Sequence, residues 1–156
     1  MPRRRTKKAS TAKPPAAKPR TAKPPTAPAS KAANLSPRRV QQILARLSEI
    51  CVSLPEVERR DVNGHADYRV RGKVFAYFLN NHHGDNIVSV CCKSALGENV
   101  DRAAREPQRF YLPPYIGPRG WFGLRLDGEA IDWSEVQNLV ELSYRLVAPK
   151  RLVRER

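Results

Sequence analysis

The segment from Gly64 to Lys93 constrains the fold more than any other part of this chain, because its pattern is that of three consecutive strands. Around Tyr68, apolar and charged residues alternate with a period of two, as in a half-buried strand. A tight turn at Arg71-Gly72 precedes an apolar and aromatic run at 74–79, and a second apolar run covers 87–92. The Asn, Gly and Asp residues between these two runs are typical of a reversing loop. The segment therefore predicts an antiparallel meander.

A helix is predicted on each side of this meander. Ser36 and Pro37 are suited to the N-cap and the first helical position, and Leu54-Pro55 ends the first helix. The last helix begins at Asp132, which forms a capping-box pattern with Glu135. Each helix has an apolar stripe at helical spacing. The first stripe is Val40, Ile43, Leu44, Leu47, Ile50 and Cys51, and the last is Val136, Leu139, Val140, Ser143, Leu146 and Val147.

The remaining elements complete an α+β fold. The polar residues 56–61 are predicted to lead into the meander, Ser94 to cap a short helix that ends at Arg105, and residues 108–112 and 121–126 to form two further strands. The order helix, three strands, helix, two strands, helix predicts a two-layer α/β sandwich with a mainly antiparallel sheet over residues 35–150. Its predicted core includes Val74, Phe78, Val90, Leu124, Leu139 and Leu146.

Residues 1–34 differ sharply in composition from the rest of the chain. They hold ten of the 29 Lys and Arg residues, seven of the 14 Pro residues and no Asp or Glu. Because their only apolar residues larger than Ala are Met1 and prolines, we expect this segment to be disordered. Its TAKPP sequence occurs twice, and its Ala/Lys/Pro composition resembles the tails of linker histones and of some bacterial histone-like proteins. We expect a sequence-independent DNA-binding arm, with a solubilising tail as the alternative. Its candidate phosphate contacts are Lys7, Lys8, Lys13, Lys18, Arg20, Lys23 and Lys31.

The charge of the chain is concentrated at its ends. Residues 35–149 carry a net charge of about +1, and the basic residues 151–156 close the chain. Three cysteines form no disulfide framework, which indicates a reducing compartment. The basic N-terminus lacks the apolar region of a secretory signal, and no run approaches the roughly 18 apolar residues of a membrane span. These features predict a cytoplasmic, nucleoid-associated protein with no membrane partner.

Within the folded part, two groups of residues are candidate DNA contacts. Arg69, Arg71 and Lys73 surround the predicted turn at Gly72. Strand alternation places Trp121 and Arg125 together on the sheet face opposite the helices, where an aromatic ring beside an Arg suits nucleic-acid contact. The alternative for the tryptophan is that a loop such as 113–118 covers it.

Histidine and cysteine residues give weaker signals. His82 and His83 lie in a predicted turn without a second pair of ligands, which favours a solvated loop over a metal site. His65 is predicted to form a structural hydrogen bond. An enzyme that uses His65 with Cys91 or Cys92 is the least supported alternative, because no third group is placed to orient them. The sequence therefore predicts no catalytic residue, no metal and no cofactor.

Four spaced motifs resemble the MmcQ/YjbR family. They are Gly64-His65-Ala66-Asp67-Tyr68-Arg69-Val70, then Gly72-Lys73-Val74-Phe75-Ala76, Gly120-Trp121, and Ser143-Tyr144-Arg145-Leu146-Val147-Ala148-Pro149-Lys150. The resemblance implies the element order given above and a likeness to the double-wing DNA-binding domain of a phage transcription factor. The sequence departs from the family pattern at Ala66-Asp67, which replaces Pro-Ala, and in its added basic tail.

The leading hypothesis is a non-enzymatic DNA-binding protein that contacts the phosphate backbone mostly through its basic tail. The alternative is a small ligand- or protein-interaction module whose tail only localises it to nucleic acid.

Overall fold

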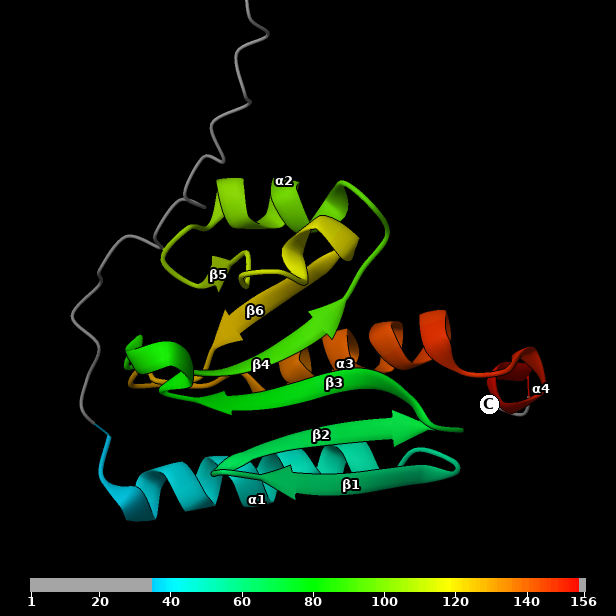
Figure 1. Ribbon diagram of the computed structural model, residues 1–156, viewed down its shortest axis with the longest axis horizontal. Helices are drawn as coiled ribbons and strands as arrows, with labels where there is room; N and C mark the ends of the chain where they lie inside the picture. The colour runs from blue at the N-terminus through cyan, green and yellow to red at the C-terminus, as the bar shows by residue number, and fades with distance from the viewer. Residues whose placement is uncertain (1–34, 155–156) are drawn as a thin grey trace, which may run out of the picture.

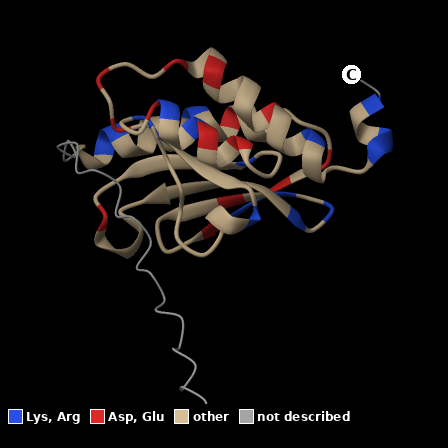
Figure 2. Cartoon of the chain, turned by 90° about the horizontal axis from the view of Figure 1, so that it is seen from above, with Lys and Arg blue, Asp and Glu red and all other residues tan. Residues whose placement is uncertain are grey.

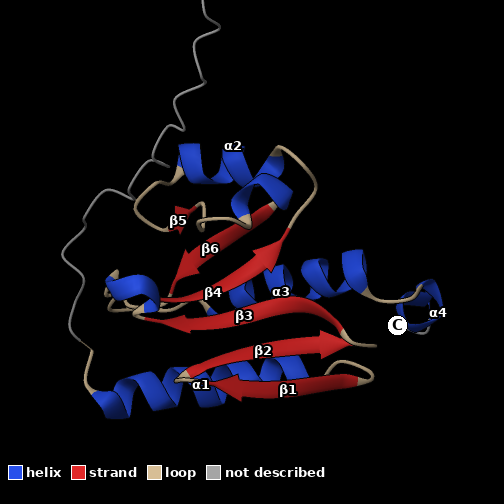
Figure 3. Ribbon diagram, viewed as in Figure 1, coloured by secondary structure: helices blue, strands red, loops and turns tan. Residues whose placement is uncertain are grey.

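The computed structural model of this chain describes residues 35–154. It has one six-stranded sheet in the order β1-β2-β3-β4-β6-β5, in which every neighbouring pair is antiparallel. Figures 1 and 3 show α1 and α3 against one face of the sheet and α2 beyond its β5 end. The elements in chain order are α1 Pro37–Val52, β1 Val57–Val62, β2 His65–Val70, β3 Lys73–Asn80, η1 His82–Gly84, β4 Val88–Lys93, α2 Glu98–Arg105, β5 Phe110–Tyr111, η2 Gly117–Arg119, β6 Trp121–Arg125, α3 Trp133–Val147 and α4 Lys150–Arg154.

This architecture confirms the α+β fold class, but β1 is one strand more than the sequence pattern predicted. All of its residues except Val57 are exposed, so no alternation of apolar and polar residues marks it. It pairs with β2 through a hairpin at Asn63-Gly64, where both residues have positive φ values of 51° and 80°. An Asn-Gly pair is the usual signal for such a turn, but the sequence prediction did not use it and so missed the strand.

The main core lies between the sheet and the two long helices. Phe75, Phe78 and Val90 are fully buried there, and the ring of Phe75 meets the edge of Tyr144 with centroids 5.4 Å apart. Leu124 and Leu139 are also buried, so four of the six predicted core residues are confirmed.

Val74 and Leu146 do not lie in this core. A β-bulge makes Tyr68 pair with Ala76 but Arg69 with Val74, so Phe75 is the extra residue and the alternation of β3 is reversed beyond it. Val74 therefore packs on the other face of the sheet. Leu146 is 54% exposed, because the last turns of α3 extend past the end of β4 (Figure 1).

Residues of the spaced motifs tie the helices to the sheet. The Ser143 hydroxyl donates to the carbonyl of Phe75 at 2.5 Å and accepts from the amide of Lys93 at 2.7 Å. The Tyr144 hydroxyl donates to the carbonyl of Pro55 at 2.9 Å. Gly120 has a φ of 89°, and a Cβ there would lie 2.7 Å from the carbonyl oxygen of Ser94. These residues therefore hold the two layers in register.

None of the helices in residues 35–154 is both long enough and apolar enough to span a membrane.

Candidate functional site

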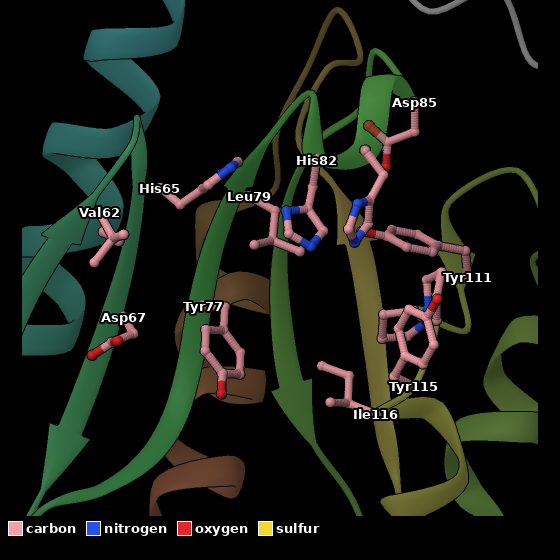
Figure 4. A pocket seen from close by; sticks show the side chains of 14 residues that line it. Val62, His65, Asp67, Tyr77, Leu79, His82, Asp85, Tyr111, Tyr115 and Ile116 are labelled. Atoms are coloured by element: carbon pink, nitrogen blue, oxygen red, sulfur yellow. The ribbon is translucent and has the colours of Figure 1, made fainter.

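The sheet face away from α1 and α3 carries a pocket of about 470 Å³ (Figure 4). Tyr77 and Leu79 of β3 form its floor, and His65 and Asp67 of β2 lie on one side. The loop that follows β5, residues 113–116, forms the opposite side. The η1 turn closes one end with His82, His83 and Asp85. The pocket is thus built from segments that are far apart in sequence.

A small apolar cluster supports the floor of this pocket. It contains Ile87, Cys91, Tyr111 and Trp121, and Tyr77 packs against it with its ring centroid 5.1 Å from that of Trp121. The hydroxyl of Tyr111 is hydrogen-bonded to that of Ser89 at 2.8 Å. A rigid, internally satisfied layer therefore lies beneath the pocket.

Gly123 allows this layer to form. Its position on β6 lies directly under the ring of Tyr111, and a Cβ there would come within 2.2 Å of a ring carbon. Glycine is therefore required at this position of β6, because the Tyr111 ring packs directly over it. The close approach of the ring to β6 fixes the depth of the pocket floor.

The three histidines come together at one end of the pocket. The rings of His65 and His82 meet edge to face at 5.0 Å, and those of His82 and His83 lie 4.0 Å apart. The Nδ1 atom of His65 accepts a hydrogen bond from the amide of Asn80 at 3.2 Å, as the structural interpretation predicted. Partial burial, and then the nearby imidazoles of His83 and His65, lower the pKa of His82. Burial and the neighbouring rings therefore favour the neutral form of the His82 imidazole.

The η1 turn was predicted to be a solvated loop. His83 is exposed as expected, whereas His82 is half-buried against the pocket. Within residues 35–154, no group of three or more His, Cys, Asp or Glu side chains is arranged to hold a metal ion.

Acidic groups are present in the pocket, but basic groups are not. No Lys or Arg lines it. Asp67 accepts two hydrogen bonds from the Arg69 guanidinium, at 2.7 and 2.9 Å. Asp85 is exposed, accepts from the amide of Ile87 at 2.9 Å, and forms no ion pair with any of the described residues. The end of the pocket near η1 therefore carries a carboxylate with no direct ion pair among the described residues, which Arg125 opposes only at longer range.

The expectation that Trp121 and Arg125 form an exposed stacking pair is wrong. Trp121 is 7% exposed, and Ile116 packs against its cluster, so the alternative of a covering loop holds. The Arg125 side chain is 9% exposed and donates two hydrogen bonds to Asp127, at 3.1 and 2.9 Å. Both side chains are used to build the fold and are not available to a duplex.

The hairpin cations are mostly engaged in ion pairs. Arg69 pairs with Asp67, and Arg71 pairs with Glu56, which also accepts from Arg151 at 3.1 Å. Arg71 lies in the turn itself, with a φ of 51°, as the predicted turn at Arg71-Gly72 implies. Lys73 is exposed and forms no ion pair within residues 35–154.

The wider surface of the domain carries mixed charge. Figure 2 shows Lys and Arg interspersed with Asp and Glu along the long helices, and only basic residues coloured on α4. The seven candidate tail cations, Lys7, Lys8, Lys13, Lys18, Arg20, Lys23 and Lys31, lie outside the described residues. The folded domain therefore presents basic and acidic groups together, although only eight of the 18 Lys and Arg residues in 35–154 form ion pairs.

The cysteines are packing residues. Cys91 and Cys92 are fully buried on opposite faces of β4, and Cys51 is buried in the main core. Burial raises the pKa of the Cys91 thiol to about 12 and that of Cys92 well above its usual value. Neither thiol is exposed as a nucleophile would need to be.

Sequence reasoning did not find the pocket. Its signals are local and weak: an exposed Val62, which is 57% exposed on the edge strand, and the Pro113-Pro114-Tyr115 loop, whose tyrosine is 85% exposed. Only the packing of this loop across β6 and β4 turns these residues into a site.

Two comparisons with known proteins support this fold. The YjbR family model matches residues 52–146. The crystal structure of a Deinococcus radiodurans protein with a DUF419 domain is similar, with a TM-score of 0.55 and 16% sequence identity over 66% of this chain and 76% of that chain. At this identity the likeness concerns the fold alone. A search of curated proteins found no match.

Proposed function

This chain belongs to the YjbR family, and from that premise we propose that it is a non-enzymatic DNA-binding protein whose affinity comes mostly from residues 1–34. The observation that supports the proposal is the uneven distribution of charge. Ten cations and no anion lie in the first 34 residues, whereas residues 35–149 are nearly neutral. A cytoplasmic, nucleoid-associated location is part of the same proposal.

Counterion release supplies the driving force. Each phosphate that a Lys or Arg neutralises releases condensed cations from the duplex, which makes log K fall with log salt by about 0.9 per contact. If six to eight of the tail cations meet phosphates, the slope is about −5 to −7. Such contacts are insensitive to base sequence, so binding is largely sequence-independent.

The folded domain adds little to this affinity. Its hairpin cations Arg69 and Arg71 are already paired with acidic groups, and a phosphate would have to displace Asp67 or Glu56 to reach them. Lys73 is the hairpin cation that stays available to a phosphate. A nearly neutral domain also lacks the long-range field that would attract a polyanion.

The test compares two full-length variants on a random duplex between about 0.05 and 0.2 M salt. In the first, the ten Lys and Arg residues of 1–34 are replaced by Gln; in the second, Arg69, Arg71 and Lys73 are replaced by Gln. We expect the tail variant to have a slope of about −1 to −3 and to bind orders of magnitude more weakly. The hairpin variant should lose at most three contacts.

The reverse result would contradict the proposal. If the tail variant keeps the slope of the natural chain while the hairpin variant loses it, the hairpin is the DNA-binding element. Equal binding by all three chains would show that tail charge does not drive the interaction.

A second function is favoured by the pocket on the open sheet face. Its volume of about 470 Å³ and its aromatic lining are typical of sites for small ligands or peptide segments. In that case the domain is an interaction module, and the tail localises it to nucleic acid.

A further inference from the structure

We propose that the pocket on the open sheet face binds one of the Lys-Pro-Pro segments in this chain's own residues 1–34. The occupant is a TAKPP sequence, which occurs at residues 11–15 and again at 21–25. This inference concerns an internal contact of the chain and does not depend on DNA binding.

The lining of the pocket has the chemistry that recognises proline. Proline-rich segments in the polyproline II conformation dock into grooves made of aromatic rings, because their ridged apolar surface packs against flat rings at low entropic cost. Tyr77 is half-buried on the pocket floor, Tyr115 stands 85% exposed at its side, and Leu79 and Ile116 lie between them (Figure 4). An exposed tyrosine beside half-buried apolar groups is a surface that a proline ring can cover.

The charge of the pocket selects a cationic segment. Asp85 is exposed at one end without an ion pair among residues 35–154, and no Lys or Arg lines the cavity. The nearby imidazole of His82 adds no positive charge at neutral pH, because its pKa is lowered. In each TAKPP sequence a lysine directly precedes the two prolines. When the prolines pack on the rings of Tyr77 and Tyr115, this lysine lies close to the end of the pocket that carries Asp85.

The tail is long enough to reach the site. Pro25 lies ten residues before Leu35 and Pro15 lies twenty before it, which correspond to about 30 and 60 Å at roughly 3.1 Å per residue. A domain of about 100 residues has a radius of gyration near 13 Å, so the longer tether spans it fully. In Figure 1, α1 begins at the same end of the sheet as the η1 turn, so the first described residues lie at the end of the sheet where the pocket's acidic end is found.

The test uses full-length protein and nuclear magnetic resonance. A variant with Pro14, Pro15, Pro24 and Pro25 replaced by Ala removes both proposed occupants without changing charge. We expect the backbone amide shifts of Tyr77, Leu79 and Ile116 to differ between this variant and the natural chain. Adding the synthetic peptide TAKPPTA to the variant should return them toward the natural values.

Two matched substitutions in the variant chain decide where the peptide binds. Tyr115→Ala should weaken peptide binding at least tenfold; since the side chain is exposed, the fold should be unchanged. Leu146→Ala removes another exposed apolar side chain, which is 54% exposed near a different hollow between α2 and α3, and should leave binding unchanged. A TAKAATA peptide should bind at least tenfold more weakly than TAKPPTA.

Three outcomes would overturn the proposal. The first is identical pocket shifts in the natural and proline-free chains. The second is peptide affinity that is indifferent to Tyr115 or to the prolines. The third is a natural-chain shift pattern that disappears on dilution, which would assign the contact to the tail of a second copy. Because no DNA is present, the result is separate from that of the salt experiment.

Discussion

The two faces of the sheet are built on different principles. The face under α1 and α3 is closed, with Phe75, Phe78 and Val90 entirely removed from solvent. Within residues 35–154, the other face has a four-residue cluster of buried apolar side chains, over which one loop and a short turn leave a pocket. The closed face therefore supplies most of the stability of the domain. The open face has side chains that remain accessible and can bind a ligand.

The motif residues that carry the family resemblance mostly serve the closed face. Tyr68 meets the hydroxyl of Ser48 on α1 at 2.8 Å, and Ser143 bridges β3 and β4 to α3. The pocket loop at 113–116 belongs to none of these motifs. His65 and Asp67 of the first motif do line the pocket, so the site combines motif residues with a loop outside the motifs.

The largest expected difference between the faces is in stability. Phe78→Ala should lower the free energy of unfolding by about 3–5 kcal/mol, because it empties a fully buried ring site. Tyr115→Ala on the open face should change it by less than about 0.5 kcal/mol. Urea unfolding of both variants measures the contrast, and similar losses would show that the pocket loop also carries stability.

A smaller effect is expected where helix and sheet are joined by a single hydroxyl. Ser143→Ala leaves the amide of Lys93 and the carbonyl of Phe75 without their side-chain partner, which should cost about 1–3 kcal/mol. Ser134→Ala on the exposed first turn of the same helix is the control. An unchanged urea midpoint for Ser143→Ala would contradict this prediction. It would mean that a water molecule enters the closed face and takes over the two hydrogen bonds of the lost hydroxyl.

The smallest effect concerns the open face and pH. Burial and neighbouring imidazoles lower the pKa of His82 in the folded state, so the unfolded chain binds its proton more readily. The corresponding stability is present above the unfolded pKa of about 6.5 and is lost as pH falls toward the folded pKa. The loss should be under about 1 kcal/mol, since the group is partly solvated.

Measuring unfolding free energies between pH 5 and 8 for the natural chain and His82→Gln isolates this contribution. The stability of the natural chain relative to His82→Gln should rise as pH increases toward about 6.5 and stay constant above that pH. Parallel curves would mean that His82 titrates as it does in the unfolded chain.

Local sequence patterns predicted the closed face well. Helical apolar stripes and strong caps placed α1 and α3, and Asp132 does accept from the amides of Ser134 and Glu135 at 3.0 and 3.1 Å. The patterns failed where one residue changes the alternation: the bulge at Phe75 moves Val74 to the other face. They failed also at Leu146, since no local pattern tells where a strand ends beneath a helix.

The open face was harder to predict for a physical reason. Arg125 suggested an accessible cation, but the fold places Asp127 two residues later at its guanidinium and buries both. Trp121 suggested an exposed ring, but the loop that covers it carries no periodicity that would reveal its path. Charge and aromaticity in a sequence state what a surface could contain, whereas accessibility depends on long-range packing.

The charged strand β1 has a consequence for assembly. Among the described strands it forms one border of the sheet, and a border strand offers unsatisfied backbone groups to any other chain that arrives in extended form. Glu58, Arg59, Arg60 and Asp61 fill its middle, so an incoming strand would have to match or bury four charges. The opposite border, β5, is only two residues long. The feature that concealed β1 from pattern recognition thus also protects the sheet against edge-to-edge aggregation.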